Sequence, residues 1–315
     1  MNVGELELRG AGGEPVDLLR TFVSHGVAEL PPMAIDEQAP SLEVTLLLSG
    51  GRARTVRVEP GRRRTALVTT PGRAPSKADA RELLAAIAHI LRLDEDLSEF
   101  YELAAGDPDL SWVASGAGRM IRSRTVFEEV VKTVCTTNCT WSATVRMVNA
   151  IVEHLGEPAA GARPQGPAGR AFPTPEAMAA AGAPFYRNVA RAGYRSAYLV
   201  SLARSVAKGK VDVEELGRAS ADALPDEELE RRLLALPGVG PYAAAHIMMM
   251  LGRYSRLIFD SWTRPKYARL VGKKKVSDRT IERRFKRYGR YAGLAFWLFL
   301  TRDWVDEEPI ISGAS

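Results

Sequence analysis

Short apolar stretches that alternate with polar residues dominate the first quarter of the chain. Residues 42–48 and 54–58 flank Ser49-Gly50-Gly51, a pattern typical of a β-hairpin, and residues 65–70 add another strand. Residues 17–25 have the apolar spacing of a helix. The pattern therefore predicts an antiparallel sheet with one helix over residues 1–77.

From residue 77 onward the apolar spacing changes to that of helices. The expected helices span residues 78–91, 96–104, 125–155, 174–181, 185–189, 194–207, 226–236, 241–251 and 291–301. The long 125–155 stretch should break near Thr137 and Asn138, whose side chains compete for backbone hydrogen bonds. Residues 156–175, rich in Gly, Pro and Ala, should form a loop. Ser277 fits the N-cap of a further, basic helix. The predicted class is α+β, mostly α.

Between the helices at 226–236 and 241–251 lies the sequence Leu236-Pro237-Gly238-Val239-Gly240-Pro241. Its two glycines permit positive φ and remove side chains that would keep a large partner away from the backbone. Proline suits the first position of the second helix, where an N–H is not needed. A tight hairpin that leads into a helix N-terminus can bind an anion. An ordinary turn between two helices would have the same local pattern.

Composition and charge narrow the classes of function. The 315 residues suffice for two or three lobes, no apolar run could span a bilayer, and the N-terminus lacks the pattern of a signal peptide. Two cysteines, Cys135 and Cys139, make neither a disulfide framework nor an iron–sulfur site, and four scattered histidines lack metal-ligand spacing. We therefore expect a protein of the reducing cytoplasm, without an iron–sulfur cluster or other cofactor.

The positive charge is concentrated in one segment. Residues 264–290 contain twelve Lys or Arg residues against two acidic residues, Asp278 and Glu282. A basic segment close to an anion-binding hairpin is typical of nucleic-acid binding. The alternative is a solvated helix with a flexible lysine turn at 273–275.

With these pieces placed, the chain resembles the helix-hairpin-helix DNA glycosylases, the superfamily of the 8-oxoguanine and bacterial alkylated-base enzymes. The resemblance covers residues 125–304 in five blocks that come in the family's order. They are residues 127–138, residues 193–204, the hairpin at 236–243, Asp260, and residues 288–295. It implies an N-terminal sheet lobe (1–77) followed by a two-lobed helical region (78–315). Residues 78–124 and 256–315 would form one lobe and residues 125–255 the central lobe.

The resemblance assigns catalysis to Asp260, which follows an apolar Leu257-Ile258-Phe259 and precedes a helix. Breaking an N-glycosidic bond places positive charge on the deoxyribose, which a fixed carboxylate stabilises, or the carboxylate activates a water. A simple N-cap aspartate is the alternative. Bifunctional members carry a lysine two residues after the second hairpin glycine and form an imine with the sugar. Here that position is Tyr242, so we expect a monofunctional enzyme.

The same resemblance suggests how DNA is held. Gly238, Val239 and Gly240 would bind the DNA backbone, together with Lys273, Lys274 and Lys275. It also allows a monovalent cation at the hairpin, residues 237–240. The expected partner is double-stranded DNA with a damaged base, bound by a monomer.

Further residues match positions that flip and read the base. Tyr194 would be the wedge, and Arg195 and Asn138 would contact the opposite base. The alternatives are a core aromatic, a surface cation and a helix-turn cap.

Tyr242, Trp141 and Phe296 would line the base pocket. Phe296 stands where the 8-oxoguanine enzymes carry a glutamine and Leu300 where they carry a phenylalanine, which favours stacking on an electron-poor alkylated purine. Phe296 could instead belong to the core. The expected substrate is an alkylated or oxidised purine, and the rival classes are a bifunctional lyase that uses another amine and a non-catalytic damage-binding protein.

Overall fold

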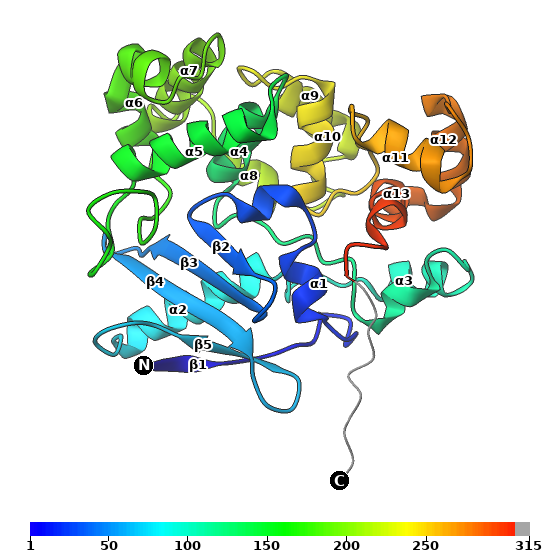
Figure 1. Ribbon diagram of the computed structural model, residues 1–315, viewed down its shortest axis with the longest axis horizontal. Coiled ribbons are helices and arrows are strands. Elements are labelled where there is room, and N and C mark those ends of the chain that lie inside the picture. The colour runs from blue at the N-terminus through cyan, green and yellow to red at the C-terminus, as the bar shows by residue number, and fades with distance from the viewer. Residues whose placement is uncertain (306–315) are drawn as a thin grey trace.

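The computed structural model describes residues 1–305, and its N-terminal part is a five-stranded antiparallel sheet (Figure 1). The strands have the spatial order β1-β5-β4-β3-β2. Their bounds are β1 (Asn2–Glu7), β2 (Met33–Asp36), β3 (Ser41–Leu47), β4 (Ala53–Pro60) and β5 (Thr65–Thr69). The predicted hairpin joins β3 to β4, with Leu42 opposite Val58 and Leu47 opposite Ala53. The outer strands β1 and β2 were not predicted.

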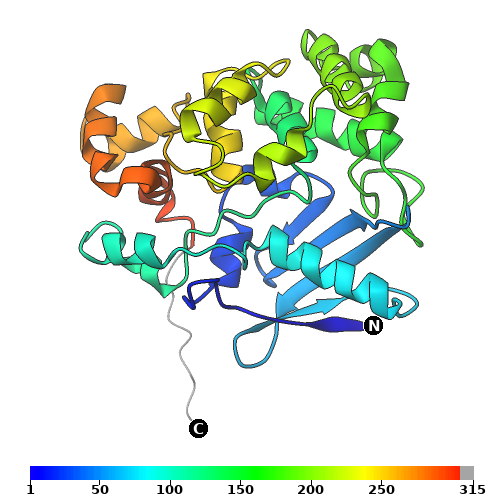
Figure 2. The same cartoon turned by 180° about the vertical axis from the view of Figure 1, so that it is seen from behind.

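One face of the sheet is covered by α2 (Lys77–Ile90), as Figure 2 shows from behind. Alternate residues of β3, such as Val44 and Leu46, share a buried cluster with Leu83 and Ile87 of α2. The expected boundary at residue 77 therefore separates α2 from the sheet on which it packs. The structure instead groups residues 1–91 around one core.

The rest of the described chain is helical, with seventeen helical segments over residues 1–305. The α-helices besides α2 are α1 (Leu18–Phe22), α3 (Ser98–Ala105), α4 (Val126–Thr136), α5 (Trp141–Leu155), α6 (Pro175–Pro184), α7 (Arg195–Ala207), α8 (Val213–Arg218), α9 (Asp226–Leu234), α10 (Pro241–Met250), α11 (Thr263–Leu270), α12 (Asp278–Phe285) and α13 (Ala292–Thr301). Single turns are η1 (Gly26–Glu29), η2 (Ser111–Ser115), η3 (Phe185–Val189) and η4 (Lys286–Tyr291).

Local signals in the sequence placed most helix ends correctly. The predicted break falls between α4 and α5, where Asn138 adopts φ 45°. Ser277 caps α12, its hydroxyl accepting the Thr280 N–H. Residues 156–174 form the expected loop, whereas α8 was not predicted.

Helix α10 stands between the two helical cores (Figure 1). Ala244 and Ile247 pack with α4, α5, α7 and α9, whereas Met249 and Met250 pack with α3, α12 and α13. Because α10 is apolar on nearly every side, it serves both lobes, as expected of a helix with no solvent face. The end of α10 that faces the hairpin is thereby fixed relative to both cores.

Candidate active site

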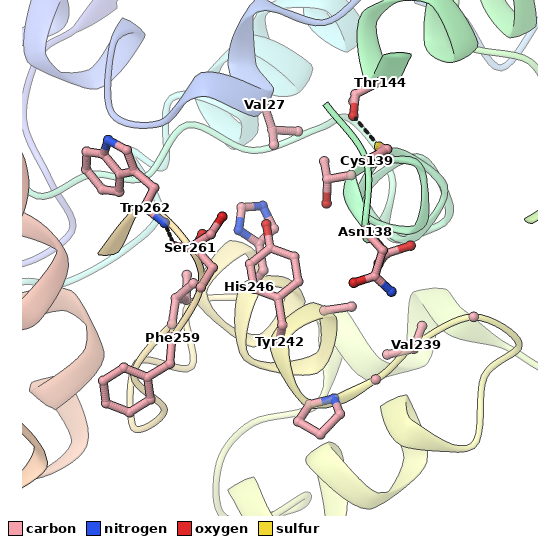
Figure 3. Close-up of a pocket in the computed structure, with 18 of the residues that line it drawn as sticks. Val27, Asn138, Cys139, Thr144, Val239, Tyr242, His246, Phe259, Ser261 and Trp262 are labelled. Carbon is pink, nitrogen blue, oxygen red and sulfur yellow. Dashed lines mark hydrogen bonds between the residues drawn. The ribbon is translucent and has the colours of Figure 1, made fainter. Parts of the chain in front are cut away.

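A cavity of about 1170 Å³ opens where the N-terminal part meets the two helical lobes. Its wall is formed by residues 25–27, by the turn between α4 and α5, by the hairpin before α10, by residues 258–262 and by Trp297 of α13. Figure 3 shows Tyr242 and His246 on α10 in the middle of this space, with Val27 across from them. A volume of this size accommodates a flipped base with its sugar.

The hairpin from Leu236 to Gly240 uses its two glycines differently. Gly238 adopts φ +84°, and a Cβ there would lie 3.0 Å from the ring of Tyr198. Gly240 has φ −101° and ψ −176°, so the expected positive φ applies only to Gly238. The Val239 N–H donates to the Leu236 carbonyl (3.2 Å), and the Ala244 N–H donates to the carbonyl of Gly240 (2.8 Å). The hairpin therefore delivers the N-terminus of α10, with its uncompensated N–H groups, to the edge of the cavity.

Asp260 lies half-buried on the cavity wall, in the turn before α11. Its Oδ1 accepts the backbone N–H groups of Trp262 (2.8 Å) and Thr263 (2.7 Å). The Thr263 hydroxyl in turn accepts the N–H of Asp260 (2.9 Å). The expected alternative of a capping aspartate is thus true as well, and it serves to fix the carboxylate, because both bonds use the one oxygen Oδ1.

Tyr242 occupies the first turn of α10 and is half-buried in the same cavity. Burial raises the pKa of its phenol, while a hydrogen bond with the Thr136 side chain acts in the opposite direction. Its ring lies 6.2 Å from the ring of His246, one helical turn further along α10. The phenol is therefore protonated at neutral pH and can donate a hydrogen bond, but it cannot form an imine.

On the side of the turn between α4 and α5, Asn138 and Tyr194 reach each other. Asn138 Nδ2 donates to the Tyr194 hydroxyl (3.4 Å), and 53% of Tyr194 is exposed. Both residues line the cavity. An exposed aromatic ring at the cavity mouth has the position that a wedge requires, and it does not belong to the core.

Arg195 takes a different position from the one expected. Only 6% of it is exposed, it is absent from the cavity lining, and its guanidinium lies 4.6 Å from the centre of the Tyr194 ring. Its Nε donates to the Thr137 hydroxyl (3.2 Å). The structure thus places Arg195 beneath Tyr194, where it joins α7 to the turn after α4, because stacking and hydrogen bonding hold a guanidinium better there than in solvent.

Neither the family models nor the curated proteins that were searched match this chain. Solved structures do. The 3-methyladenine DNA glycosylase of Archaeoglobus fulgidus superposes with a TM-score of 0.71 at 22% identity, covering 96% of this chain and 100% of that one. The 8-oxoguanine glycosylase/lyase of Clostridium acetobutylicum, in its apo form, gives 0.69 at 21% identity, with 92% and 94% covered. The chain has the fold of these DNA glycosylases. The predicted fold class is confirmed.

A second structure of the Clostridium acetobutylicum enzyme contains double-stranded DNA with cytosine opposite 8-oxoguanine, and it matches with a TM-score of 0.68 at 21% identity. It covers 91% of this chain and 92% of the other. The shared fold therefore extends to a DNA-bound member.

Phe296 does not reach the cavity. It is fully buried and packs against Phe259, Tyr267 and Phe285, at ring distances between 5.3 and 6.0 Å. Its neighbour Trp297 lines the cavity instead. The expectation of Phe296 in the base pocket is corrected by one position on a helix that is apolar all round.

Aromatic side chains nevertheless form much of the wall. Trp262 stacks near Trp297 (5.7 Å) and Trp304 (5.8 Å), and all three line the cavity. Trp141, which was expected in the pocket, lies on the lining and is 44% exposed. Such flat apolar faces suit stacking on a base.

Lys273, Lys274 and Lys275 form an exposed turn between α11 and α12, outside the cavity lining. Among residues 1–305 there is no group of three or more His, Cys, Asp or Glu residues that could hold a metal ion. No helix in the same part of the chain is long and apolar enough to cross a membrane.

Sequence reasoning missed two histidines of the cavity, His25 and His246. His25 belongs to the N-terminal part and His246 to α10, so only the fold brings them together. A polar residue in the apolar 241–251 helix was the one signal that could have pointed to His246.

Proposed function

We propose that the protein is a monofunctional DNA glycosylase that flips an alkylated or oxidised purine out of duplex DNA, hydrolyses its N-glycosidic bond and leaves an abasic site. The observation that carries this proposal is the pairing of Asp260 with Tyr242 in one base-sized cavity beside the hairpin. The first residue supplies fixed negative charge. The second occupies the position at which a lyase needs an amine.

The chemistry requires little movement of Asp260. Its carboxylate is held through Oδ1 by two backbone N–H groups, so its charge is already in place when the sugar becomes cationic. The same carboxylate can orient a water for attack on C1′. The N-terminus of α10 and the hairpin amides would bind a phosphate of the same strand.

Amines are far from the required position. No lysine of the described chain lines the cavity. Lys266, the nearest lysine after Asp260 in the sequence, pairs with Asp303 at 2.6 Å. The N-terminal amine of Met1 donates to the carbonyl of Thr70 in the sheet (2.8 Å). These positions support hydrolysis without strand cleavage, because β-elimination needs an amine that forms an imine.

Double-stranded DNA that contains a damaged base is the partner that we propose. Asn138 and Tyr194 would enter the gap left by the flipped base, while Lys273, Lys274 and Lys275 would contribute phosphate contacts. We expect a monomer that needs no cofactor or iron–sulfur cluster, and a monovalent cation at the hairpin stays a prediction.

The test is base release from duplexes that carry different damaged purines, compared between the wild type and Asp260→Asn. The asparagine Oδ1 can still accept the N–H groups of Trp262 and Thr263, so the fold and DNA binding should persist. Loss of the charge should slow release by about 10²–10³-fold. Asp222→Asn, an exposed change outside the cavity, is the matched control.

Wild-type release rates in Asp260→Asn would refute the mechanism. Tight binding of damaged duplex without any base release by the wild type would instead identify a damage-binding protein. Strand breaks that appear without alkali or heat would identify a lyase.

A further inference from the structure

Two histidines at the deep end of the cavity have no role in the mechanism above. His25 and His246, here called the histidine floor, are each 4% exposed and line the cavity. Their ring centres lie 5.9 Å apart with the planes at 83°. One comes from the N-terminal part and the other from α10, so the cavity is closed at this end by two imidazoles from separate parts of the fold.

The hydrogen bond of His25 fixes the character of its other nitrogen. Nε2 lies 2.6 Å from the carbonyl oxygen of Ile121, and a carbonyl can only accept, so Nε2 carries the hydrogen. Burial, followed by the effect of His246, lowers the pKa of His25 to about 4, so the ring is neutral at physiological pH. The remaining nitrogen, Nδ1, is then an acceptor, and it has no hydrogen-bond partner within residues 1–305.

His246 presents a second nitrogen of the same kind. Its Nε2 is buried and also lacks a partner in the described chain, and burial lowers the pKa of the ring. A neutral imidazole can place its hydrogen on either nitrogen, so Nε2 can donate or accept according to what faces it. Figure 3 shows the ring beside Tyr242, toward the centre of the cavity.

Unpaired polar atoms at the end of an aromatic cavity point to a ligand that pairs with them. A buried polar atom without a partner destabilises the fold, and an apolar side chain would fill the same place without that cost. The walls, with Trp262 and Trp297, can stack on any base. Discrimination between bases therefore belongs to the histidine floor.

Resting on the proposed function, we propose that the histidine floor reads the flipped base by hydrogen bonds, and that the excised purine carries an N–H on the edge remote from its sugar. His25 Nδ1 accepts this N–H, and His246 Nε2 pairs with the neighbouring group of the edge. Methylated or oxidised purines that keep a ring N–H or an amino group fit this pattern. In 1,N6-ethenoadenine the same edge is closed into a third ring without an N–H, so it would leave His25 unpaired.

The experiment measures single-turnover release and equilibrium binding for duplexes with 7-methylguanine, 8-oxoguanine or 1,N6-ethenoadenine, relative to undamaged duplex. His246→Phe keeps a flat ring and removes the nitrogens, and His246→Leu is the second non-bonding variant in case the larger ring does not fit. His246→Gln restores a polar group. His154→Phe, an exposed change on α5 outside the cavity, is the matched control.

We expect the wild type to prefer at least one N–H-bearing lesion over ethenoadenine by about 100-fold or more, because a site built for a hydrogen bond rejects analogues that lack it. His246→Phe or His246→Leu should slow release of that lesion at least tenfold and weaken its selective binding. The unfolding midpoint should be unchanged or higher, since an unpaired buried nitrogen is removed. His246→Gln should recover part of the rate. A merely structural histidine would lower the midpoint and all rates alike.

Two results would overturn the inference. One is equal release of ethenoadenine and the N–H-bearing lesions by the wild type. The other is a selectivity in His246→Phe or His246→Leu within twofold of wild type. If no base is released from any duplex, the proposed function fails, and the binding series alone decides whether the histidine floor discriminates.

Discussion

Acid should destabilise this protein through His25, and the structure gives the size of the effect. The pKa of His25 is lowered from 6.5 to about 4, first by burial and then by the neighbouring His246. Above pH 6.5 the ring is neutral in the folded and the unfolded chain, so it adds no pH dependence. Below that pH the unfolded chain takes up a proton that the folded chain refuses until about pH 4.

Stability is therefore fully present above pH 6.5 and is lost as the pH falls toward the folded pKa. Each pH unit in that window costs up to about 1.4 kcal/mol, so between about pH 6.5 and pH 5 the loss through this one group is about 2 kcal/mol. His246 and His89, whose pKa values are also lowered, add losses of the same sign. The effect of His25 must therefore be measured as a difference.

The assay is urea unfolding at a series of pH values between about 7 and 5 for the wild type and His25→Gln. Glutamine does not titrate, and its amide N–H can replace the donor to the Ile121 carbonyl. The variant should lose about 2 kcal/mol less than the wild type across the range. His154→Gln, which removes an exposed histidine, should follow the wild type. Identical pH slopes for wild type and His25→Gln would refute the reasoning.

Three further predictions concern the DNA-binding face and the reaction. Tyr242→Lys should give weak borohydride trapping on damaged duplex, because the cavity lowers the pKa of an introduced amine toward its nucleophilic form, whereas efficient trapping by the wild type would show that another amine acts. Neutralising Lys273, Lys274 and Lys275 should reduce the slope of log K against log salt by up to about one unit for each phosphate that the variant no longer neutralises, and an unchanged slope would make them a solvated turn. Gly238→Ala should lower the unfolding free energy by about 1 kcal/mol or more, because φ +84° and the nearby tyrosine ring both oppose a Cβ. Unchanged stability in denaturant unfolding would contradict that account.

Local patterns predicted what local physics decides. The hairpin before α10, the break at Asn138 and the cap at Ser277 each depend on a few consecutive residues, and the structure has all three. The position of Asp260 on the cavity wall followed from its distance to the hairpin. Strand β1 was missed because it pairs with β5, more than sixty positions away, as Glu5 opposite Leu67 shows.

The remaining differences have the same origin. Helix α13 is apolar at nearly every position, so periodicity could not say that Trp297 rather than Phe296 faces the cavity. Arg195 looked like a surface cation because its partners, Thr137 and the Tyr194 ring, lie across a turn and not along its own helix. His25 becomes part of the cavity only when the N-terminal sheet region docks onto the helices.

The two-sided packing of α10 bears on how this scaffold can evolve. After the leading proline, all its positions except Tyr242 and His246 are committed to one core or the other. Truncating a buried Ile or Met there costs about 2–5 kcal/mol, a large part of the stability of a typical protein. Heritable change in the preferred base is thus channelled to two sites one helical turn apart. A lineage can revise what it repairs at these sites while the rest of the helix stays nearly invariant.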